Sequence, residues 1–140
     1  MKLNFKDLWK NYPTGSVRGT CGQYNNQCAI KMSAAINNSG VNIRSGYRYK
    51  NVCTAGGSTN IRGAETLARH LRRVYRKPLI YLRPHRAKIL LKNKKGIIFF
   101  KDLAGFRGGI GDHIDLWNGK RTKSGSYFHI CSQVWFWPVS

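Results

Sequence analysis

One cysteine and one histidine occur in settings that suit a cysteine nucleophile and its general base. Cys28 stands directly before residues 29–36, a run with helix-forming character, so we expect it where a helix begins. Unpaired backbone N–H groups and the positive end of the helix dipole gather at such a start, and both favour a thiolate over a thiol. His113 lies in residues 111–117, which alternate like a strand and lead into an Asn-Gly turn. Together the two residues predict nucleophilic catalysis by a thiolate.

A third polar group normally holds the imidazole of such a pair in the right tautomer, while the base takes the thiol proton and later gives it to the leaving amine. Asp115 shares a strand face with His113. Side chains at i and i+2 of a strand are about 6.5–7 Å apart along it, which makes a direct hydrogen bond between them awkward. The orienting group could therefore come from the neighbouring strand, where the candidates are Ser124, Ser126 and His129.

The oxyanion that forms during attack on a carbonyl needs hydrogen-bond donors. Backbone N–H groups at the start of the Cys28 helix suit this role, and Gln23 is a candidate side-chain donor in the preceding loop. The other histidines have ordinary structural settings. His70 is predicted on the polar face of a helix, and His85 on the surface among Arg and Pro residues, so we expect neither to be catalytic.

The elements that must position these residues follow from the pattern of apolar residues. Three helices are expected, over residues 4–10, 29–36 and 63–75. Three strands are expected, over residues 96–101, 111–117 and 127–137. Polar, Gly-rich residues 15–27 and 41–58 indicate loops, and Asn118-Gly119 predicts that the last two strands are antiparallel neighbours. Helices first and strands later favour an α+β fold, in one domain of residues 1–140, with helices packed on an antiparallel β-sheet.

The chain is strongly basic, with 25 Lys and Arg against 5 Asp and Glu and a net charge of +20. Eleven of the basic residues and no acidic one fall in residues 69–95, which we call the basic segment. Such a field attracts nucleic acid, an anionic bacterial envelope or an acidic protein, although it can also be no more than a solvated face. A basic nucleic-acid-binding or nuclease toxin is therefore one alternative, and a protein that coats anionic surfaces is another. Neither accounts for Cys28 and His113, and no zinc-finger or RNP-type motif is present.

Cysteine spacing and apolar run length bear on metals and on location. No C-x-x-C pair occurs, so we expect no zinc site and no cofactor. If Cys28 is free, at most one disulfide can form among Cys21, Cys53 and Cys131, and inert buried thiols are the alternative. No run approaches the roughly 20 apolar residues that span a bilayer. Because residues 1–6 lack the apolar length of a signal peptide, action outside the cytosol would require other machinery.

Four blocks of the chain resemble the fourth family of type VI secretion amidase effectors, toxins related to the NlpC/P60 peptidases, which place Cys and His as papain-like hydrolases do. The blocks are residues 27–33, 63–68, 95–100 and 112–119. The resemblance runs from about Leu8 to the C-terminus. The Cys-Ala-Ile and His-Ile-Asp-Leu-Trp-Asn-Gly sequences, in that order and spacing, carry most of it.

The resemblance implies a papain-like, NlpC/P60-like fold and cleavage of peptidoglycan peptide stems. The bond implied is the amide between γ-D-glutamate and meso-diaminopimelate, with Cys28 as nucleophile and His113 as base. The family also uses an aspartate after the Asn-Gly turn, where residues 120–126 contain no Asp and no Cys. Asp115 matches the family's own motif and is the candidate for the third catalytic residue. Further implications are a type VI secretion delivery component, action in the periplasm of a target cell, and a cognate immunity protein that plugs the active site. The basic charge leads us to expect that this partner is acidic.

Overall fold

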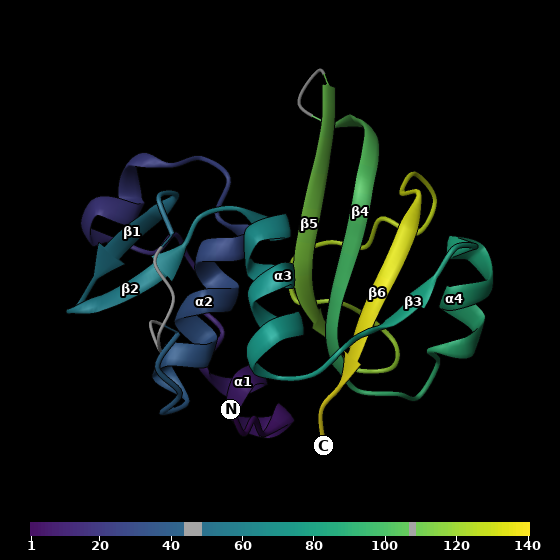
Figure 1. The fold of residues 1–140 in the computed structure, drawn as a ribbon, viewed down its shortest axis with the longest axis horizontal. Coiled ribbons are helices and arrows are strands. Elements are labelled where there is room, and N and C mark those ends of the chain that lie inside the picture. The colour runs from purple at the N-terminus through teal and green to yellow at the C-terminus, as the bar shows by residue number, and fades with distance from the viewer. Residues whose placement is uncertain (44–48, 107–108) are drawn as a thin grey trace.

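The computed structural model describes residues 1–43, 49–106 and 109–140 (Figure 1). The elements before the first long strand are α1 (Phe5–Asn11), the 3₁₀ helix η1 (Gly19–Gln23), α2 (Cys28–Asn38), β1 (Val52–Ala55), β2 (Ser58–Ile61), α3 (Ala64–Val74), β3 (Leu79–Tyr81) and α4 (Pro84–Leu90). They are followed by β4 (Gly96–Phe106), β5 (Gly109–Trp117) and β6 (Gln133–Pro138). The expected α+β class is confirmed.

The central sheet has the strand order β3-β6-β4-β5, and all of its neighbouring strands are antiparallel. Figure 1 shows α2 and α3 beside the β5 edge, while β3 and α4 lie at the opposite edge. Strand β4 is covered on both faces. Ile97 and Phe99 join the core formed with α1, α2 and α3, whereas Ile98 and Phe100 join a second cluster with residues of α4. Burial on both faces explains why the start of this strand is a continuous apolar run.

The predicted pairing of the last two strands is wrong. β5 and β6 do not touch as neighbours but lie on either side of β4. The Asn118-Gly119 sequence makes only a local turn, in which the Asn118 N–H donates to the carbonyl of Arg121 at 3.1 Å. Residues 127–131 also turn back on themselves, so the last strand starts at Gln133 rather than at Tyr127. Beside β4, the aromatic side chains of β6 are buried on both faces of the sheet, Trp135 and Trp137 in one cluster and Phe136 in the other.

Other local predictions also need correction. Residues 41–58 are not all loop, because β1 forms a hairpin with β2 through Gly56 and Gly57, both of which have positive φ. Residues 44–48 of that prediction lie outside the described part of the chain. η1, β3 and α4 were not foreseen, since each is short and α4 begins at Pro84 in a strongly basic stretch. His70 is fully buried and within 2.8 Å of the Tyr49 hydroxyl, so it does not lie on a polar face.

A disulfide joins Cys21 of η1 to Cys53 of β1, while Cys28 and Cys131 are free. It links the segment just before α2 to the hairpin 32 residues later, and Ile30 of α2 packs against it. Of the two outcomes left open for these cysteines, the structure therefore has the single disulfide. In the described residues, no helix combines the length and hydropathy needed to cross a membrane.

Candidate active site

Cys28 is the first residue of α2, as predicted, and its side chain is almost fully buried. The loop before it is held by Gln27, whose Oε1 accepts from the Val17 N–H at 2.8 Å. The Nε2 of Gln27 donates to the carbonyls of Cys21 and Tyr24, at 3.0 and 2.8 Å. These bonds satisfy a buried amide and fix the path of the chain into the helix. The backbone N–H of Cys28 makes only a long contact, 3.4 Å, to Oδ1 of Asn26.

His113 lies on β5, also as predicted, and is 5% exposed. Its ring meets that of Tyr127 edge-on, with centroids 4.9 Å apart, and lies 6.1 Å from that of Phe100. The Cys28 side chain lies beside the imidazole, since both residues line one pocket and Cys28 contributes to the raised pKa of His113. Residues from the start of α2 and from the sheet edge therefore meet, which is the juxtaposition that the residue types predicted.

Asp115 hydrogen-bonds directly to His113, with its Oδ2 2.7 Å from Nε2. The expected difficulty of an i, i+2 contact was wrong. The strand spacing of about 6.5–7 Å separates backbone positions, and an imidazole leaning along the strand is long enough to close it. Since Nε2 is engaged by the carboxylate, Nδ1 is the ring nitrogen left for the sulfur of Cys28.

The Asp115 carboxylate is fully buried and surrounded by donors. Four backbone N–H groups donate to it at 2.7–3.1 Å, those of Leu116, Lys123, Ser124 and Gly125. The hydroxyl of Ser124 donates as well, at 2.7 Å, and lies 3.4 Å from Nε2 of His113. A buried carboxylate is stable in its charged form only with such partners. The segment after the Asn-Gly turn contains no aspartate, but the backbone N–H groups of residues 123–125 donate to Asp115 of β5.

Two opposing effects set the protonation of His113. Burial by itself would lower the pKa of the imidazole, but the hydrogen bonds to Asp115 and Cys28 and the charges of both groups outweigh burial and raise that pKa to about 9. Tyr12, which is buried and whose hydroxyl lies 3.2 Å from that of Ser124, has its pKa raised by burial and then by the charge of Asp115. The raised pKa keeps the imidazole of His113 positively charged at neutral pH.

A pocket of about 230 Å³ opens where Cys28 and His113 meet. It is lined by Asn26, Gln27, Cys28, Lys31, His113, Ser124 and Tyr127. Sequence reasoning missed Asn26, Lys31 and Tyr127. The signal for Lys31 was available, because i and i+3 residues of a helix are neighbours and Lys31 follows Cys28 by three.

The other predicted site residues lie elsewhere. Gln23 is exposed at the end of η1 and does not line this pocket. Ser126 lies 3.1 Å from the hydroxyl of Thr122, and His129 is exposed in the turn before β6. Of the three candidates for orienting the imidazole from the following segment, only Ser124 reaches the site, and it does so mainly through Asp115.

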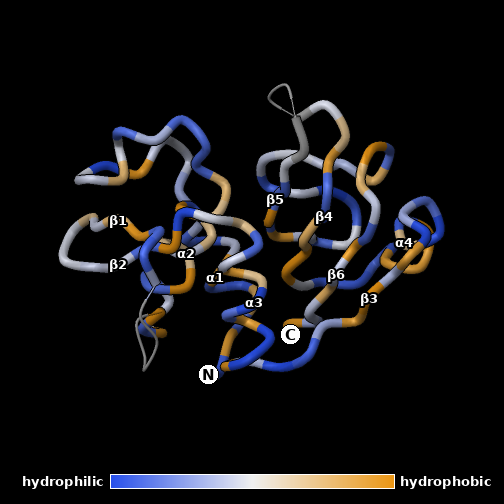
Figure 2. The backbone as a smooth tube through the Cα atoms, turned by 45° about the horizontal axis from the view of Figure 1, so that its top comes forward, coloured by the Kyte–Doolittle hydropathy of each residue, from blue (hydrophilic) through white to orange (hydrophobic). Residues whose placement is uncertain are grey.

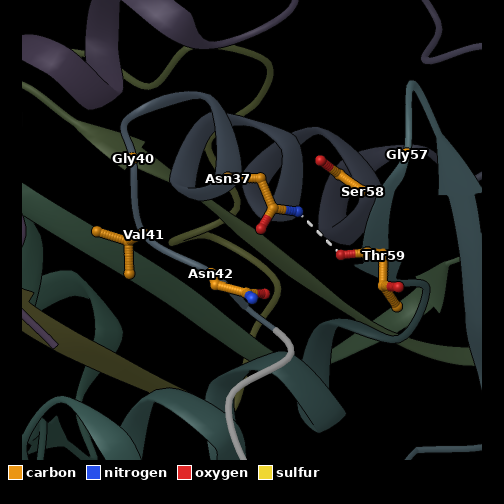
Figure 3. A pocket seen from close by; sticks show the side chains of 7 residues that line it. All are labelled: Asn37, Gly40, Val41, Asn42, Gly57, Ser58 and Thr59. Carbon is orange, nitrogen blue, oxygen red and sulfur yellow. Dashed lines mark hydrogen bonds between the residues drawn. The ribbon is translucent and has the colours of Figure 1, made fainter.

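A second pocket, of about 310 Å³, lies between the end of α2 and the β1–β2 hairpin (Figure 3). Its lining includes Asn37, which donates to the carbonyl of Thr59 at 2.9 Å. None of the side chains drawn there is titratable, so the pocket offers no acid or base that could activate its Ser and Thr hydroxyls. Within the described residues, no group of three or more His, Cys, Asp or Glu side chains could hold a metal ion.

The sequence also matches a known family. Residues 24–137 fit the family described as type VI secretion system (T6SS), amidase effector protein 4, or Tae4. The chain belongs to the Tae4 family. It is therefore an amidase effector of type VI secretion, and the resemblance noted in its sequence is confirmed. No curated protein sequence matches the chain.

Solved Tae4 structures have the same fold. Tae4 from Enterobacter cloacae superposes with a TM-score of 0.85 at 20% identity, over 100% of this chain and 98% of that one. Tae4 from Salmonella Typhimurium, in a complex with Tai4, gives 0.85 at 21% identity over all of both chains. Another structure of the Salmonella protein, bound to the immunity protein Tai4 of E. cloacae, gives 0.84 at 22% identity, over 98% of this chain and 99% of that one. At such identities the likeness concerns the fold.

Proposed function

We propose that this Tae4-family amidase is a cysteine hydrolase with Cys28 as nucleophile, His113 as base and Asp115 as the residue that orients the imidazole. The observation that carries the proposal is the line of contacts from the Cys28 side chain through His113 to the buried Asp115 carboxylate. In this reading the fold is papain-like and NlpC/P60-like, with the nucleophile at a helix start and the base on a strand. Residues 1–140 then act as one catalytic domain.

The geometry supports a two-step acyl transfer. The Cys28 thiolate attacks the amide carbonyl, and backbone N–H groups at the start of α2 hold the oxyanion. The contact from Asn26 to the Cys28 N–H is long enough to be exchanged for that oxygen. Gln23 receives no support for this role from its position. As the C–N bond breaks, protonated His113 gives its proton to the leaving amine and a thioester remains on Cys28.

Water completes the reaction. His113, now neutral, takes a proton from a water molecule that attacks the thioester carbonyl, and the product carboxylate leaves as the Cys28 thiolate is restored. The Asp115 carboxylate accepts the Nε2–H bond throughout, which keeps Nδ1 directed at the sulfur and stabilises the imidazolium. No step needs a metal or a cofactor.

The substrate we propose is the peptide stem of peptidoglycan, cut between γ-D-glutamate and meso-diaminopimelate in the periplasm of a target cell. Membership of an amidase effector family supports an amide of the envelope, and the Cys28 and His113 sequence blocks support this particular bond. Delivery would be through a component of the type VI apparatus.

We also propose a cognate immunity partner. Solved Tae4 proteins have been crystallised with the immunity protein Tai4. The net charge of +20 leads us to expect an acidic partner for this chain, which would cover the pocket at Cys28 and thereby exclude the substrate.

Digestion of purified sacculi, followed by mass analysis of the released fragments, tests the bond assignment. The wild-type chain should release stems that end in γ-D-glutamate and fragments that begin with free diaminopimelate, while the folded Cys28→Ala protein should release neither. Cleavage at another bond, or equal release by Cys28→Ala, would overturn the proposal. A fluorescence-labelled DNA binding assay at the same salt concentration checks the nucleic-acid alternative.

A further inference from the structure

Lys31 stands one helical turn beyond Cys28 and lines the same pocket. Its side chain is half-buried, and among the described residues that line this pocket it is the one Lys or Arg. Side chains three apart on a helix have Cβ atoms about 5–6 Å from each other, so a Lys there can reach groups bound next to the sulfur. A cation thus lies beside the nucleophile.

The positive charge of Lys31 has no carboxylate to balance it nearby. All five acidic residues of the chain fall in the described ranges, and no ion pair joins any of them to Lys31. No Asp or Glu lines the pocket, and Asp115 is sealed behind His113 by its own donors. A half-buried ammonium that makes no ion pair and lines a small pocket is matched by a ligand with negative charge.

We infer that Lys31 forms a carboxylate-binding subsite for the substrate, and that it takes the free α-carboxylate of the γ-linked glutamate. The inference rests on the proposed function, because that carboxylate is separated from the scissile carbonyl only by the short glutamate side chain. With the carbonyl held at Cys28, the carboxylate lies within the span of one helical turn. The subsite would therefore position the acyl side of the scissile bond and reject stems in which this carboxylate is an amide.

Kinetics on two soluble stem peptides test the subsite. One peptide carries the free α-carboxylate of glutamate, and the other carries the corresponding amide. The wild type should have a kcat/KM about tenfold higher for the carboxylate, mostly through KM, as expected for a charge-assisted hydrogen bond. Lys31→Gln should lose this discrimination, and Lys31→Arg should recover part of it. A matched control is Lys88→Gln, an exposed residue of α4 at the far edge of the sheet, which should discriminate like the wild type.

Several results would overturn the inference. Wild-type cleavage of both peptides at equal kcat/KM would do so while leaving the proposed function intact. A Lys31→Gln variant that keeps the wild-type preference would have the same meaning. If Lys31→Gln lowered kcat/KM equally for both peptides and shifted the acidic limb of the pH–rate profile, Lys31 would instead stabilise the Cys28 thiolate. A third peptide, amidated only at diaminopimelate, should be cleaved like the unmodified one, and a selective loss with it would move the subsite to the other side of the bond.

Binding separates failure of the subsite from failure of the bond assignment. Calorimetric titration of the uncleaving Cys28→Ala protein should show about tenfold tighter binding of the carboxylate peptide, and the Cys28→Ala, Lys31→Gln protein should show equal binding of both. If the wild type cleaves neither peptide but Cys28→Ala still prefers the carboxylate peptide in a Lys31-dependent way, the proposed scissile bond is wrong. The carboxylate-binding subsite is then supported. Equal binding of both peptides by the Cys28→Ala protein would show that the carboxylate-binding subsite does not exist.

Discussion

The two edges of the central sheet treat polar groups in opposite ways. At the β5 edge, His113 and Asp115 are 5% and 0% exposed, and the carboxylate is hydrogen-bonded to His113, to Ser124 and to backbone N–H groups. At the β3 edge, residues 79–95 of the basic segment carry exposed Arg and Lys side chains around apolar ones, including Leu82 and Ile89 at 71% and 74% exposure. Figure 2 shows this mixture of hydrophobic and hydrophilic residues along β3 and α4.

This difference indicates that the chemistry is separated from the exposed basic residues at the β3 edge. Buried polar groups interact strongly because water does not screen them, whereas exposed charges act at long range and are screened by salt. The β5 edge, which carries the buried polar groups, is therefore suited to holding protons at defined atoms. The basic segment is suited to attraction of an anionic envelope or an acidic partner, and it contains neither Cys28 nor His113.

The largest expected effect is at the nucleophile. Cys28→Ala should abolish hydrolysis of sacculi while the far-UV circular dichroism stays native. The matched control is Cys131→Ala, because burial raises the pKa of that free thiol to about 11 and keeps it protonated at neutral pH. Cys131→Ala should retain wild-type turnover. If the two variants behaved alike, the nucleophile assignment and the placement of the chemistry at the β5 edge would both be wrong.

Loss of the base should follow closely. His113→Ala should lower kcat/KM at least about 100-fold, the low end for a positioned proton-transfer group. His129→Ala is the comparison, since His129 is exposed outside the pocket and should cost little. Near-wild-type activity in His113→Ala would transfer the role of base to another residue.

Asp115→Asn should cost about tenfold or more, but less than His113→Ala, because the imidazole remains while its charged acceptor is lost. The control is Asp102→Asn, an exposed aspartate on β4 whose positive φ of 55° Asn also tolerates. Steady-state rates on a soluble muropeptide, with thermal melts to check folding, measure both. A loss equal to that of His113→Ala in a folded protein would make the carboxylate as essential as the base.

The pH dependence should sharpen the picture of the buried pair. The pKa of His113 is raised from 6.5 to about 9, so its contribution to stability is fully present below pH 6.5 and is lost as pH rises through about 9. The kcat/KM should fall over the same alkaline range as the imidazolium loses its proton. In Asp115→Asn this limb should move to lower pH, because a group that raises the pKa is removed. If the alkaline limb of the Asp115→Asn profile did not move, Asp115 would have no influence on the pKa of His113.

The smallest effect on chemistry is expected from the basic segment. Raising salt from 0.1 to 1 M shortens the Debye length from about 10 to about 3 Å, which should weaken sacculus binding steeply and change turnover of a soluble muropeptide little. Reversing the charges of Arg72, Arg76, Lys92 and Lys94, all exposed, should mimic high salt. A variant that binds sacculi normally yet fails on the soluble muropeptide would place the basic segment in the active site and remove the contrast between the edges.

The sequence by itself determined the local settings of the reactive groups. Helix-forming residues after Cys28 and alternation around His113 depend on neighbours in the chain, so the helix start and the strand could be predicted. The α+β class follows from the same local patterns. The family blocks added the type of reaction, which local patterns alone do not specify.

Only the tertiary structure decided how distant segments meet. The order β3-β6-β4-β5 depends on which apolar faces pair, and a turn signal such as Asn118-Gly119 does not contain that information. The bond between His113 and Asp115 depends on the lean of both side chains, and the cradle of N–H donors depends on the path of the segment that follows. Lys31 enters the pocket because α2 packs against β5. Buried polar groups are hydrogen-bonded by whichever donors the fold brings near them. The separation of two residues in the sequence does not predict which donors these are.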